Sequence, residues 1–390
     1  MFFTEPENAA RSDMDPMQPK IKIAIFGVGG GGCNAINRLV ASPGDFKGVK
    51  FIAANTDAMA LSQVKDEGVE KIYLGRRTTE GMGAGSNPEI GKHAANESKE
   101  EITNAIRGMN LLFVTAGMGG GTGTGAAPVV ASIAQELKIL TIGVVTKPFR
   151  FEGTKKMQVA ENGIDDLRRY VDVLVVIPNE KAFMLSNNKE DAMVEVFRMA
   201  DNVLKQSILG VVNIVGRHSV INTDFADIRT VIEKKGMVHI GIGHASGENR
   251  VMDALRQACK NPLMDTSVKG AHNVIIDIST DGTVSADRIS EAYNMIPEIV
   301  AKDANIITGF GFTGDKDEVT VTIIATGFED DISKEMNDQK RTKAKAEEEL
   351  LNEFGLNKFP DEEPAKKAEE PKDNIPAFLR FMRNSSREGK

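Results

Sequence analysis

The sequence predicts an α/β fold: a doubly wound, mainly parallel sheet, then a long central helix, then a second α/β domain. The first observation is a series of apolar runs that alternate with helical patterns as far as Asn179: KIKIAIF, VKFIAAN, NLLFVTAG, ILTIGVVT and VDVLVVIPN. Nearly continuous apolar strands separated by helices are typical of a mainly parallel sheet covered on both faces. The second observation is that four later strand-like runs, between Asn222 and Phe328, alternate with two further helical patterns.

The central helix is predicted from roughly Lys189 to Val215, because its apolar residues recur at helical spacing. The last two strands are joined by GDKD, which predicts a hairpin-like turn. After Phe328 the composition shifts to Lys, Glu, Asp, Ala and Pro, so too little apolar surface remains to offset the entropy of ordering. The predicted divisions are a flexible tail 1–19, a ligand-binding domain 20–188, the central helix and its connection 189–221, the second domain 222–328, a disordered linker 329–372 and a terminal segment 373–390.

Composition and charge argue against several classes of protein. The formal net charge of −8 disfavours a nucleic-acid binder, which needs a basic surface. No apolar run is long enough to cross a bilayer, and the N-terminus lacks the basic and apolar regions of a signal peptide. The two cysteines, Cys33 and Cys259, stand outside any metal-ligand spacing. We therefore expect a cytoplasmic protein without disulfides and without a metal held by clustered side chains.

The stretch GMGGGTGTG, from Gly117 to Gly125, has six glycines in nine residues directly after an apolar strand. Glycine loses more conformational freedom on folding than any other residue, so a run of glycines needs a reason. Such a run suits backbone that wraps around a ligand with its N–H groups turned inward, most often around phosphate at the start of a helix. A helix-compatible segment follows at Ala126, with Pro128 suited to a first turn. The stretch therefore predicts a phosphate-binding loop.

A second glycine-rich loop, GVGGGGCN from Gly27 to Asn34, follows the first strand and precedes a helix. It satisfies G-x-G-x-x-G, and Asp57 lies near the acidic position of a dinucleotide fold, so an NAD-binding domain is one interpretation. A dinucleotide fold has one such phosphate turn, whereas two loops favour a triphosphate held from both sides. Neither loop contains G-K-[ST], which excludes a P-loop nucleotidase. A third loop, GMGAGSNPE, precedes a helix that Asn87 and Pro88 begin.

These motifs, in this order, resemble the FtsZ family of tubulin-like GTPases. The matching stretches are GVGGGGCNA, NTDA, GAGSNPEIG, TAGMGGGTGTGAAP, TKPFRFEG, IPNEK, NTDFADIRTV, GIGHASGENR and the terminal DNIPAFLR. The resemblance implies a GTP-binding domain at 20–188, an activation domain at 222–328, and a GTPase that polymerises head to tail into a division ring at the septum. It also implies Mg²⁺ beside the phosphates, for which the sequence offers no clear protein ligand. An NAD-dependent oxidoreductase and a non-catalytic, nucleotide-switched scaffold are the alternatives.

The resemblance assigns GTP binding to several loops. The first glycine loop would lie along the phosphates and ribose, the second would hold the β- and γ-phosphates, and Ala84 and Gly85 would close on the γ-phosphate side. Glu152 would bind the ribose, with Asn179 beside the sugar. Lys156 stands where the family commonly has arginine, and it keeps the charge but loses the bidentate fork. The glycine-loop residues so assigned are Gly30, Gly31, Gly32, Cys33, Asn34, Gly119, Gly120, Gly121, Thr122, Gly123, Thr124 and Gly125.

Phe197 and Asp201 stand four residues apart on the predicted central helix and therefore point the same way. Spacing alone favours a core phenylalanine and a solvent-exposed aspartate; the resemblance instead makes them the pair that reads the base. An aromatic face can stack on a purine, which contributes about 1–3 kcal/mol in such contacts. A carboxylate accepts hydrogen bonds from guanine N1–H and the exocyclic amine, whereas adenine has no donor at N1.

The segment NTDFADIRTVIEKKG predicts a helix start that Asn222 or Thr223 can cap. Asp224 and Asp227 are three residues apart, and aspartates also favour helix N-termini for capping and dipole reasons alone. The glycine loops contain no residue that positions an attacking water, so a hydrolase needs acidic groups from elsewhere. In the FtsZ family this loop inserts into the nucleotide pocket of the next subunit, which assigns catalysis to Asn222, Asp224 and Asp227.

The terminal segment has apolar residues at i, i+3, i+4 and i+7, from Ile375 to Met382. A short amphipathic segment on a flexible linker suits docking into a groove of a partner protein. Direct membrane binding, aided by nearby arginines, is the alternative, but so short an apolar face is a marginal anchor. The resemblance implies recruitment under the membrane at the division site by adaptor and regulator proteins that bind Ile375, Pro376, Phe378, Leu379 and Arg380.

Overall fold

The computed structural model describes residues 21–42, 44, 46–65, 67–181, 193–216, 224–233, 236–260, 267–312 and 317–328. All of these belong to one compact unit of the chain. The predicted N-terminal tail, linker and terminal segment lie outside the described residues. Among the helices that are described, none is both long and apolar enough to cross a bilayer.

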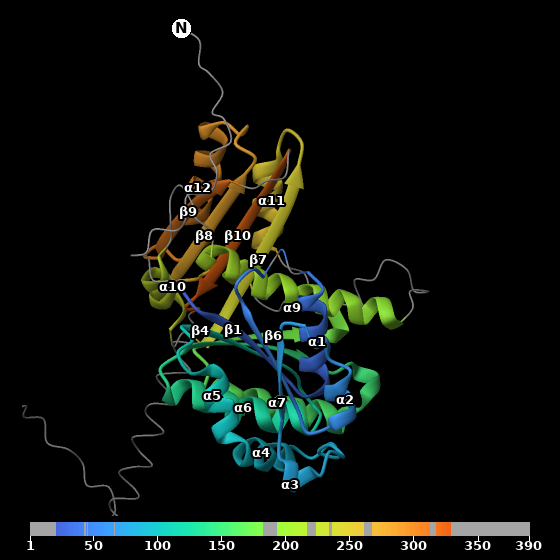
Figure 1. Cartoon of the computed structure of the whole chain (residues 1–390). Coiled ribbons are helices and arrows are strands. Elements are labelled where there is room, and N and C mark those ends of the chain that lie inside the picture. The colour runs from blue at the N-terminus through green and yellow to red at the C-terminus, as the bar shows by residue number, and fades with distance from the viewer. Residues whose placement is uncertain are drawn as a thin grey trace, which may run out of the picture. The chain divides into compact units, whose positions relative to one another are not determined.

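Six parallel strands form the first part of the sheet, in the order β3-β2-β1-β4-β5-β6 (Figure 1). Every residue of β1 is buried, as are the first six of the seven residues of β4, because helices cover both faces of the sheet. The doubly wound parallel sheet expected from the sequence is confirmed. The strands are β1 (Ile23–Val28), β2 (Lys50–Asn55), β3 (Val69–Tyr73), β4 (Leu111–Gly117), β5 (Leu140–Lys147) and β6 (Val173–Pro178).

Helices on the two faces of this sheet bury separate apolar clusters. One face is covered by α1 (Gly29–Val40), α2 (Ala58–Ser62) and α9 (Met193–Gly216), through residues such as Ile36, Leu61 and Ile208. The other is covered by α4 (Pro88–Glu97), α5 (Lys99–Ile106), α6 (Thr122–Glu136) and α7 (Thr154–Arg168). Two short helices, α3 (Arg76–Thr79) and the 3₁₀ turn η1 (Arg150–Glu152), complete this part.

The second part continues the sheet in the order β7-β10-β8-β9 and contains both antiparallel and parallel pairs. Its own apolar cluster packs α11 (Arg250–Cys259) and α12 (Ala286–Ile299) against the strands. The strands are β7 (Gly236–Ser246), β8 (Asn273–Thr280), β9 (Asn305–Phe312) and β10 (Glu318–Thr326). The predicted second α/β region is therefore present as a mixed sheet.

The prediction that the last two strands, β9 and β10, form a hairpin is wrong. Strand β8 lies between β9 and β10, paired parallel with β9 and antiparallel with β10. Turn residues mark where the chain reverses but do not specify which strand becomes the neighbour. Here the reversal is tied to the loop after β8, because the amide of Asp317 donates to a carboxylate oxygen of Asp281 at 2.8 Å.

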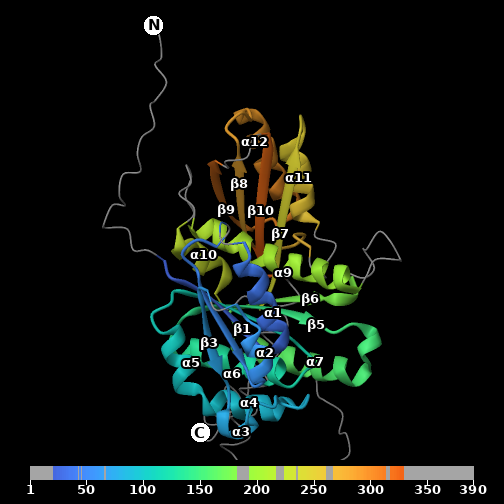
Figure 2. The same cartoon turned by 45° about the vertical axis from the view of Figure 1, so that its right-hand side comes forward.

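The two parts are joined by a narrow ladder and a shared core. Strand β7 pairs with β6 over two residue pairs, Val173 with Gly236 and Leu174 with Met237. In Figure 1 and Figure 2 the helix α9 runs between the two parts, with α10 (Phe225–Ile232) close to the second. One apolar cluster contains residues of α9, α10 and strands of both parts, including Val144 of β5 and Ile324 of β10.

Candidate functional site

The carboxyl ends of β1, β4, β5 and β6 surround a cavity of about 540 Å³, the position at which open α/β sheets bind ligands. Its wall is built from the first turns of α1 and α6, the loops after β5 and β6, and one side of α9. The lining residues are Gly30, Gly31, Asn34, Arg38, Ala116, Gly117, Met118, Gly120, Gly121, Thr122, Gly123, Thr146, Pro148, Glu152, Lys156, Asn179, Asp201 and Leu204. Residues from both predicted glycine loops and from the predicted sugar and base sites therefore meet at one cavity.

The two glycine loops pack backbone against backbone. A Cβ on Gly31 of the first loop would come within 2.9 Å of the Gly117 nitrogen, and one on Gly29 within 2.8 Å of the Gly123 nitrogen. By contrast, an added Cβ on Gly30 or Gly120 would meet no heavy atom of the described residues within 4 Å. Some glycines thus allow the loops to approach each other, and others leave room in the cavity.

The N-termini of α1 and α6 face this cavity, and both differ from most helix N-termini in their capping. Within the described residues, neither α1 nor α6 has a side-chain cap, and neither has an acidic residue in its first turn. Free N–H groups and the positive end of the helix dipole favour an anion at such a position. Their convergence makes the cavity suited to a polyphosphate.

The second loop differs from expectation in detail. Helix α6 begins at Thr122, so Pro128 lies inside it and not in its first turn. The Thr124 hydroxyl accepts a hydrogen bond from the Gly119 amide at 2.9 Å, and the Thr122 hydroxyl is 2.6 Å from that of Thr56. Thr122 lines the cavity, whereas Thr124 and Gly125 face the opposite side of the helix turn.

The predicted sugar end contains an ion pair between Lys156 and Glu152. The other oxygen of Glu152 accepts a hydrogen bond from the Phe149 amide at 2.8 Å, so the carboxylate is fixed. Asn179, directly after β6, is 8% exposed, and its side-chain oxygen has no hydrogen-bond partner among the described residues. A buried acceptor without a donor is costly, and a ligand hydroxyl or amine would satisfy it.

At the predicted base end, Asp201 of α9 lines the cavity together with Leu204 and Arg38. Asp201 forms an ion pair with Arg38 of α1. Burial lowers the pKa of the Arg38 guanidinium, and the positive charge of Arg198 lowers it further. The side chain of Phe197 lies outside the described residues.

Several predicted site residues are not brought to the cavity wall. Gly32 is packed against the backbone of Gly27 and Thr115. The thiol of Cys33 points to the carbonyl oxygen of Ala54 at 3.9 Å, and burial raises its pKa to about 12, so it is neutral near pH 7. Ala84, Gly85 and Gly119 do not line the cavity either. Gly119 is packed against Lys156, where an added Cβ would be 2.8 Å from the carbonyl oxygen, and Ala84 is packed against Gly121, whose added Cβ would be 2.8 Å from the Ala84 Cβ.

Two of the predicted catalytic residues, Asp224 and Asp227, lie at the start of α10. Asp224 is the N-cap of α10 and accepts a hydrogen bond from the Asp227 amide at 2.8 Å, so it does the capping expected of Asn222 or Thr223. Neither aspartate lines the cavity of its own chain, and Asn222 is outside the described residues. The described residues also contain no cluster of three or more His, Cys, Asp or Glu side chains suited to a metal.

Several residues at the site were not anticipated, among them Arg38 and Thr56, and Asp57 was interpreted differently. Arg38 follows Asn34 by four residues on α1, a spacing that puts both on one helix face and could have identified it. Thr56 lies in NTDA, one of the stretches that resemble the FtsZ family, and that stretch could have identified it. Asp57, considered for a dinucleotide ribose, instead caps α2 by accepting a hydrogen bond from the Ala60 amide at 2.9 Å. Asn87 and Pro88 begin α4 as expected, as its N-cap and first residue.

Comparisons with known proteins agree with this arrangement. A family model described as the GTPase domain of the Tubulin/FtsZ family matches residues 22–187, and one described as the C-terminal domain of the FtsZ family matches residues 236–329. An FtsZ dimer from M. jannaschii is similar at 38% identity and a TM-score of 0.72, over 80% of this chain and 89% of that one. A GTPγS-bound protofilament of CetZ2 from Haloferax volcanii is 20% identical with a TM-score of 0.68, over 84% of this chain and 100% of that one, a likeness of fold alone.

Proposed function

The chain belongs to the tubulin/FtsZ family of GTP-binding cytoskeletal proteins, and we propose that it hydrolyses GTP at the junctions of a head-to-tail filament of its own copies. In this proposal the filaments form the division ring at the future septum. Each copy binds GTP at the cavity between its glycine loops and supplies an acidic loop to the cavity of its neighbour.

The observation that carries the proposal is the convergence of two uncapped helix N-termini, those of α1 and α6, on one cavity. Backbone N–H groups aimed at the phosphates stabilise negative charge both in bound GTP and as it develops during transfer of the γ-phosphoryl group to water. Gly30 and Gly120 leave space for phosphate oxygens to approach the backbone. Mg²⁺, when bound, would neutralise phosphate charge, with Thr122 as the nearby hydroxyl and water as its other ligands.

Selection of guanine is assigned to Asp201, whose carboxylate lines the same cavity. Guanine presents two adjacent donors, N1–H and the exocyclic amine, which match two carboxylate oxygens. Adenine would present a lone pair at N1 to a negative charge. Leu204 supplies apolar surface one helical turn away, and the unpartnered oxygen of Asn179 is a suitable acceptor for the nucleoside.

Hydrolysis in trans is supported by the acids that line the cavity. Among the described residues these are Glu152 and Asp201, the first ion-paired with Lys156 and the second with Arg38, so neither is free to position water. Asp224 is exposed on α10. Capping uses one of its oxygens, which leaves the other for a water at the pocket of the next copy. That the similar M. jannaschii structure is a dimer supports self-association.

Recruitment to the cytoplasmic side of the membrane is proposed to depend on adaptor and regulator proteins that bind Ile375, Pro376, Phe378, Leu379 and Arg380. Deletion of 373–390 should leave GTP-driven polymerisation intact and abolish adaptor-dependent recruitment to vesicles. If the isolated terminal peptide binds protein-free vesicles at physiological salt, the direct-membrane alternative is favoured instead.

The function is tested by light scattering and phosphate release with GTP, ATP and NAD added separately in the presence of Mg²⁺. GTP alone should produce both signals, and chelation of Mg²⁺ by EDTA should abolish phosphate release. NAD binding without a response to GTP would favour an oxidoreductase. GTP-dependent scattering without phosphate release would favour a nucleotide-switched scaffold.

A further inference from the structure

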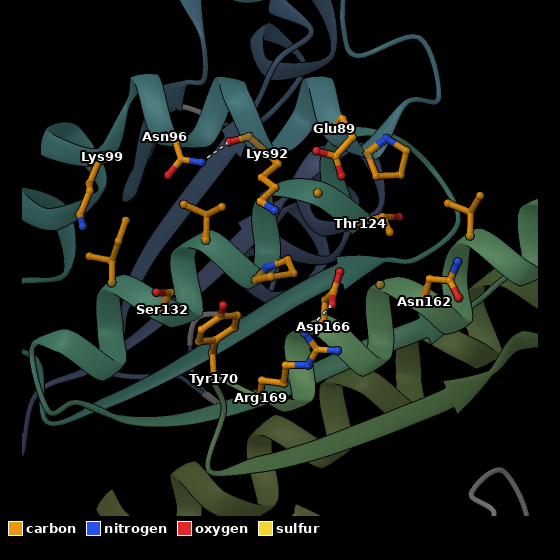
Figure 3. Close-up of a pocket in the computed structure, with 17 residues that line it drawn as sticks. Glu89, Lys92, Asn96, Lys99, Thr124, Ser132, Asn162, Asp166, Arg169 and Tyr170 are labelled. Atoms are coloured by element: carbon orange, nitrogen blue, oxygen red, sulfur yellow. Dashed lines mark hydrogen bonds and ion pairs between the residues drawn. The ribbon is translucent and has the colours of Figure 1, made fainter. Parts of the chain in front are cut away.

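A second cavity, of about 480 Å³, lies on the opposite side of the first turn of α6 from the nucleotide pocket. Helix α6 forms its floor, and α4 and α7 form its walls (Figure 3). We call it the α4–α6–α7 groove. It is only slightly smaller than the 540 Å³ nucleotide pocket, and none of the roles proposed above uses it.

The groove and the nucleotide pocket share one helix turn. Thr122 and Gly123 line the nucleotide pocket, whereas Thr124 and Gly125 line the groove. The Thr124 hydroxyl accepts a hydrogen bond from the amide of Gly119 in the phosphate loop, at 2.9 Å. A displacement of Thr124 from the groove side would therefore be transmitted directly to the loop that is proposed to hold phosphate.

The same turn is held tightly from both walls. A Cβ on Gly125 would lie 1.9 Å from the Pro88 carbonyl oxygen of α4, and one on Gly163 of α7 would lie 2.2 Å from the Thr124 methyl group. Closely packed interiors transmit small shifts because they cannot absorb them. The turn between the two cavities thus has little freedom to move without shifting its neighbours.

The lining of the groove defines a chemical class of ligand. Its floor is apolar at Pro128, Val129 and Ile133, all of which are largely buried. Lys92 extends from α4 toward α6, between the walls (Figure 3). Two other cations are already paired: Lys99 with Glu136 at 3.0 Å and Arg169 with Asp166 at 3.4 Å.

Within the described part of the chain Lys92 makes no ion pair. The lining contains three cations, Lys92, Lys99 and Arg169, against two carboxylates, in a protein whose net charge is −8. An apolar floor with one uncommitted ammonium group fits a small molecule that has an apolar body and one anionic group. Such pockets, apolar with a few convergent polar groups, are the usual form of ligand sites.

We propose that the α4–α6–α7 groove binds a small amphipathic anion, with its apolar body on Pro128, Val129 and Ile133 and its anion at Lys92, and that occupancy changes nucleotide affinity through Thr124. The binding itself is independent of the proposed function, whereas the coupling rests on the proposed nucleotide pocket. By linkage, ligand and nucleotide must change each other's affinity by the same factor.

The probe is 1-anilinonaphthalene-8-sulfonate, an aromatic anion, and its sulfonate-free analogue N-phenyl-1-naphthylamine is the neutral control. The chain contains no tryptophan, so Tyr170→Trp at the groove places a single reporter there. Saturable quenching of that tryptophan by the anionic probe is expected. In this background Lys92→Gln should lower the affinity for the anionic probe at least threefold and leave the affinity for the neutral probe unchanged. Ser132→Phe should block both probes, while Lys302→Gln, an exposed lysine of the second part, should affect neither.

Circular dichroism verifies that each variant is folded before it is compared. If quenching is the same in Lys92→Gln and Ser132→Phe as without these substitutions, the probe binds elsewhere and the binding proposal is overturned. The coupling is measured by repeating the titration with saturating GDP, which should change the probe's dissociation constant at least twofold. An unchanged constant, with GDP binding verified separately, would overturn the coupling. Failure of GDP to bind would count against the proposed function and not against the groove.

Discussion

The guanidinium of Arg38 in α1 forms an ion pair with the carboxylate of Asp201 in α9. Both residues line the cavity that is proposed to bind the nucleotide. The pair links the helix that begins at the first glycine loop to the central helix, and it sets the position of the carboxylate before a base arrives. A guanine that bonds to both carboxylate oxygens has to share Asp201 with Arg38 or displace it.

Replacement of Asp201 by alanine should weaken GTP binding about tenfold or more, since a hydrogen bond to a charged group contributes about 1.5–3 kcal/mol. Discrimination against ATP should decrease at the same time, because the carboxylate that repels the adenine N1 lone pair is lost. Calorimetric titration with both nucleotides measures this. Asp165→Ala, an exposed residue of α7, is the matched control. Wild-type affinity and selectivity in Asp201→Ala would show that the carboxylate does not read the base.

Gly125→Ala should destabilise the fold by about 1–3 kcal/mol, the usual effect of forcing an extra methyl group into packed structure. The obstruction is backbone, at 1.9 Å from the Pro88 oxygen and 2.7 Å from the Lys92 nitrogen, and cannot rotate away. Gly30→Ala, also at a helix start, meets no described heavy atom within 4 Å and should leave the melting temperature essentially unchanged. Equal melting temperatures for the two variants would contradict this account of the close contact between α4 and α6.

Catalysis shared between copies is tested by mixing two inactive variants. Asp224→Asn keeps an oxygen that can cap α10 but removes the charge, so it should fold and bind GTP yet hydrolyse it poorly. Gly121→Arg should prevent nucleotide binding and keep an intact acidic loop. Gly121 lines the pocket, and a side chain there would clash with Ala84 and Asn87 and displace the phosphate loop. Junctions that join the first variant's pocket to the second's loop should release phosphate faster than the two separate rates combined.

Co-sedimentation verifies that the two variants assemble together. Confirmed co-assembly without recovered phosphate release would exclude the shared site, as would a wild-type rate from Asp224→Asn alone. A wild-type melting temperature in Asp224→Asn separates a catalytic role of the charge from its role as a helix cap.

Asp281 should make stability depend on pH in acid. Hydrogen bonds from the Thr283 amide and hydroxyl and from the Asp317 amide lower the pKa of its carboxyl from 3.8 to about 2. The pKa of Asp281 is lower in the folded state than in the unfolded state. Its carboxylate therefore contributes fully to stability above the ordinary pKa of 3.8, and this contribution is lost as the pH falls toward about 2. Asp281→Asn should therefore be less stable than the wild type at pH 6, and the difference should narrow at pH 3. Urea unfolding at both pH values measures it, with the exposed Glu298→Gln as a control that should show no such narrowing.

Local patterns were sufficient for much of the fold and for part of the site. Alternating apolar strands and helices predicted the parallel sheet, and Asn87 with Pro88 predicted the start of α4, because these depend on neighbours in sequence. Partners that depend on packing were missed. The prediction of a hairpin was wrong because β8 lies between β9 and β10 and pairs with both. The hydroxyl of Thr124 turns back to Gly119, and Arg38 meets Asp201 through the packing of α1 beside α9. Neither contact leaves a motif in the sequence.

One apolar cluster extends from Val144 of β5, through Ile208 of α9, to Ile324 of β10, and we therefore expect the two halves of the molecule to unfold together on heating. A calorimeter should record one cooperative melting event for the described fold and not two. A fragment that ends before α9 would expose the apolar face of α1 and of the sheet beneath it, and would be prone to aggregation. Each half therefore contributes apolar side chains to the core of the other, and a destabilising substitution in α9 should lower the stability of both halves.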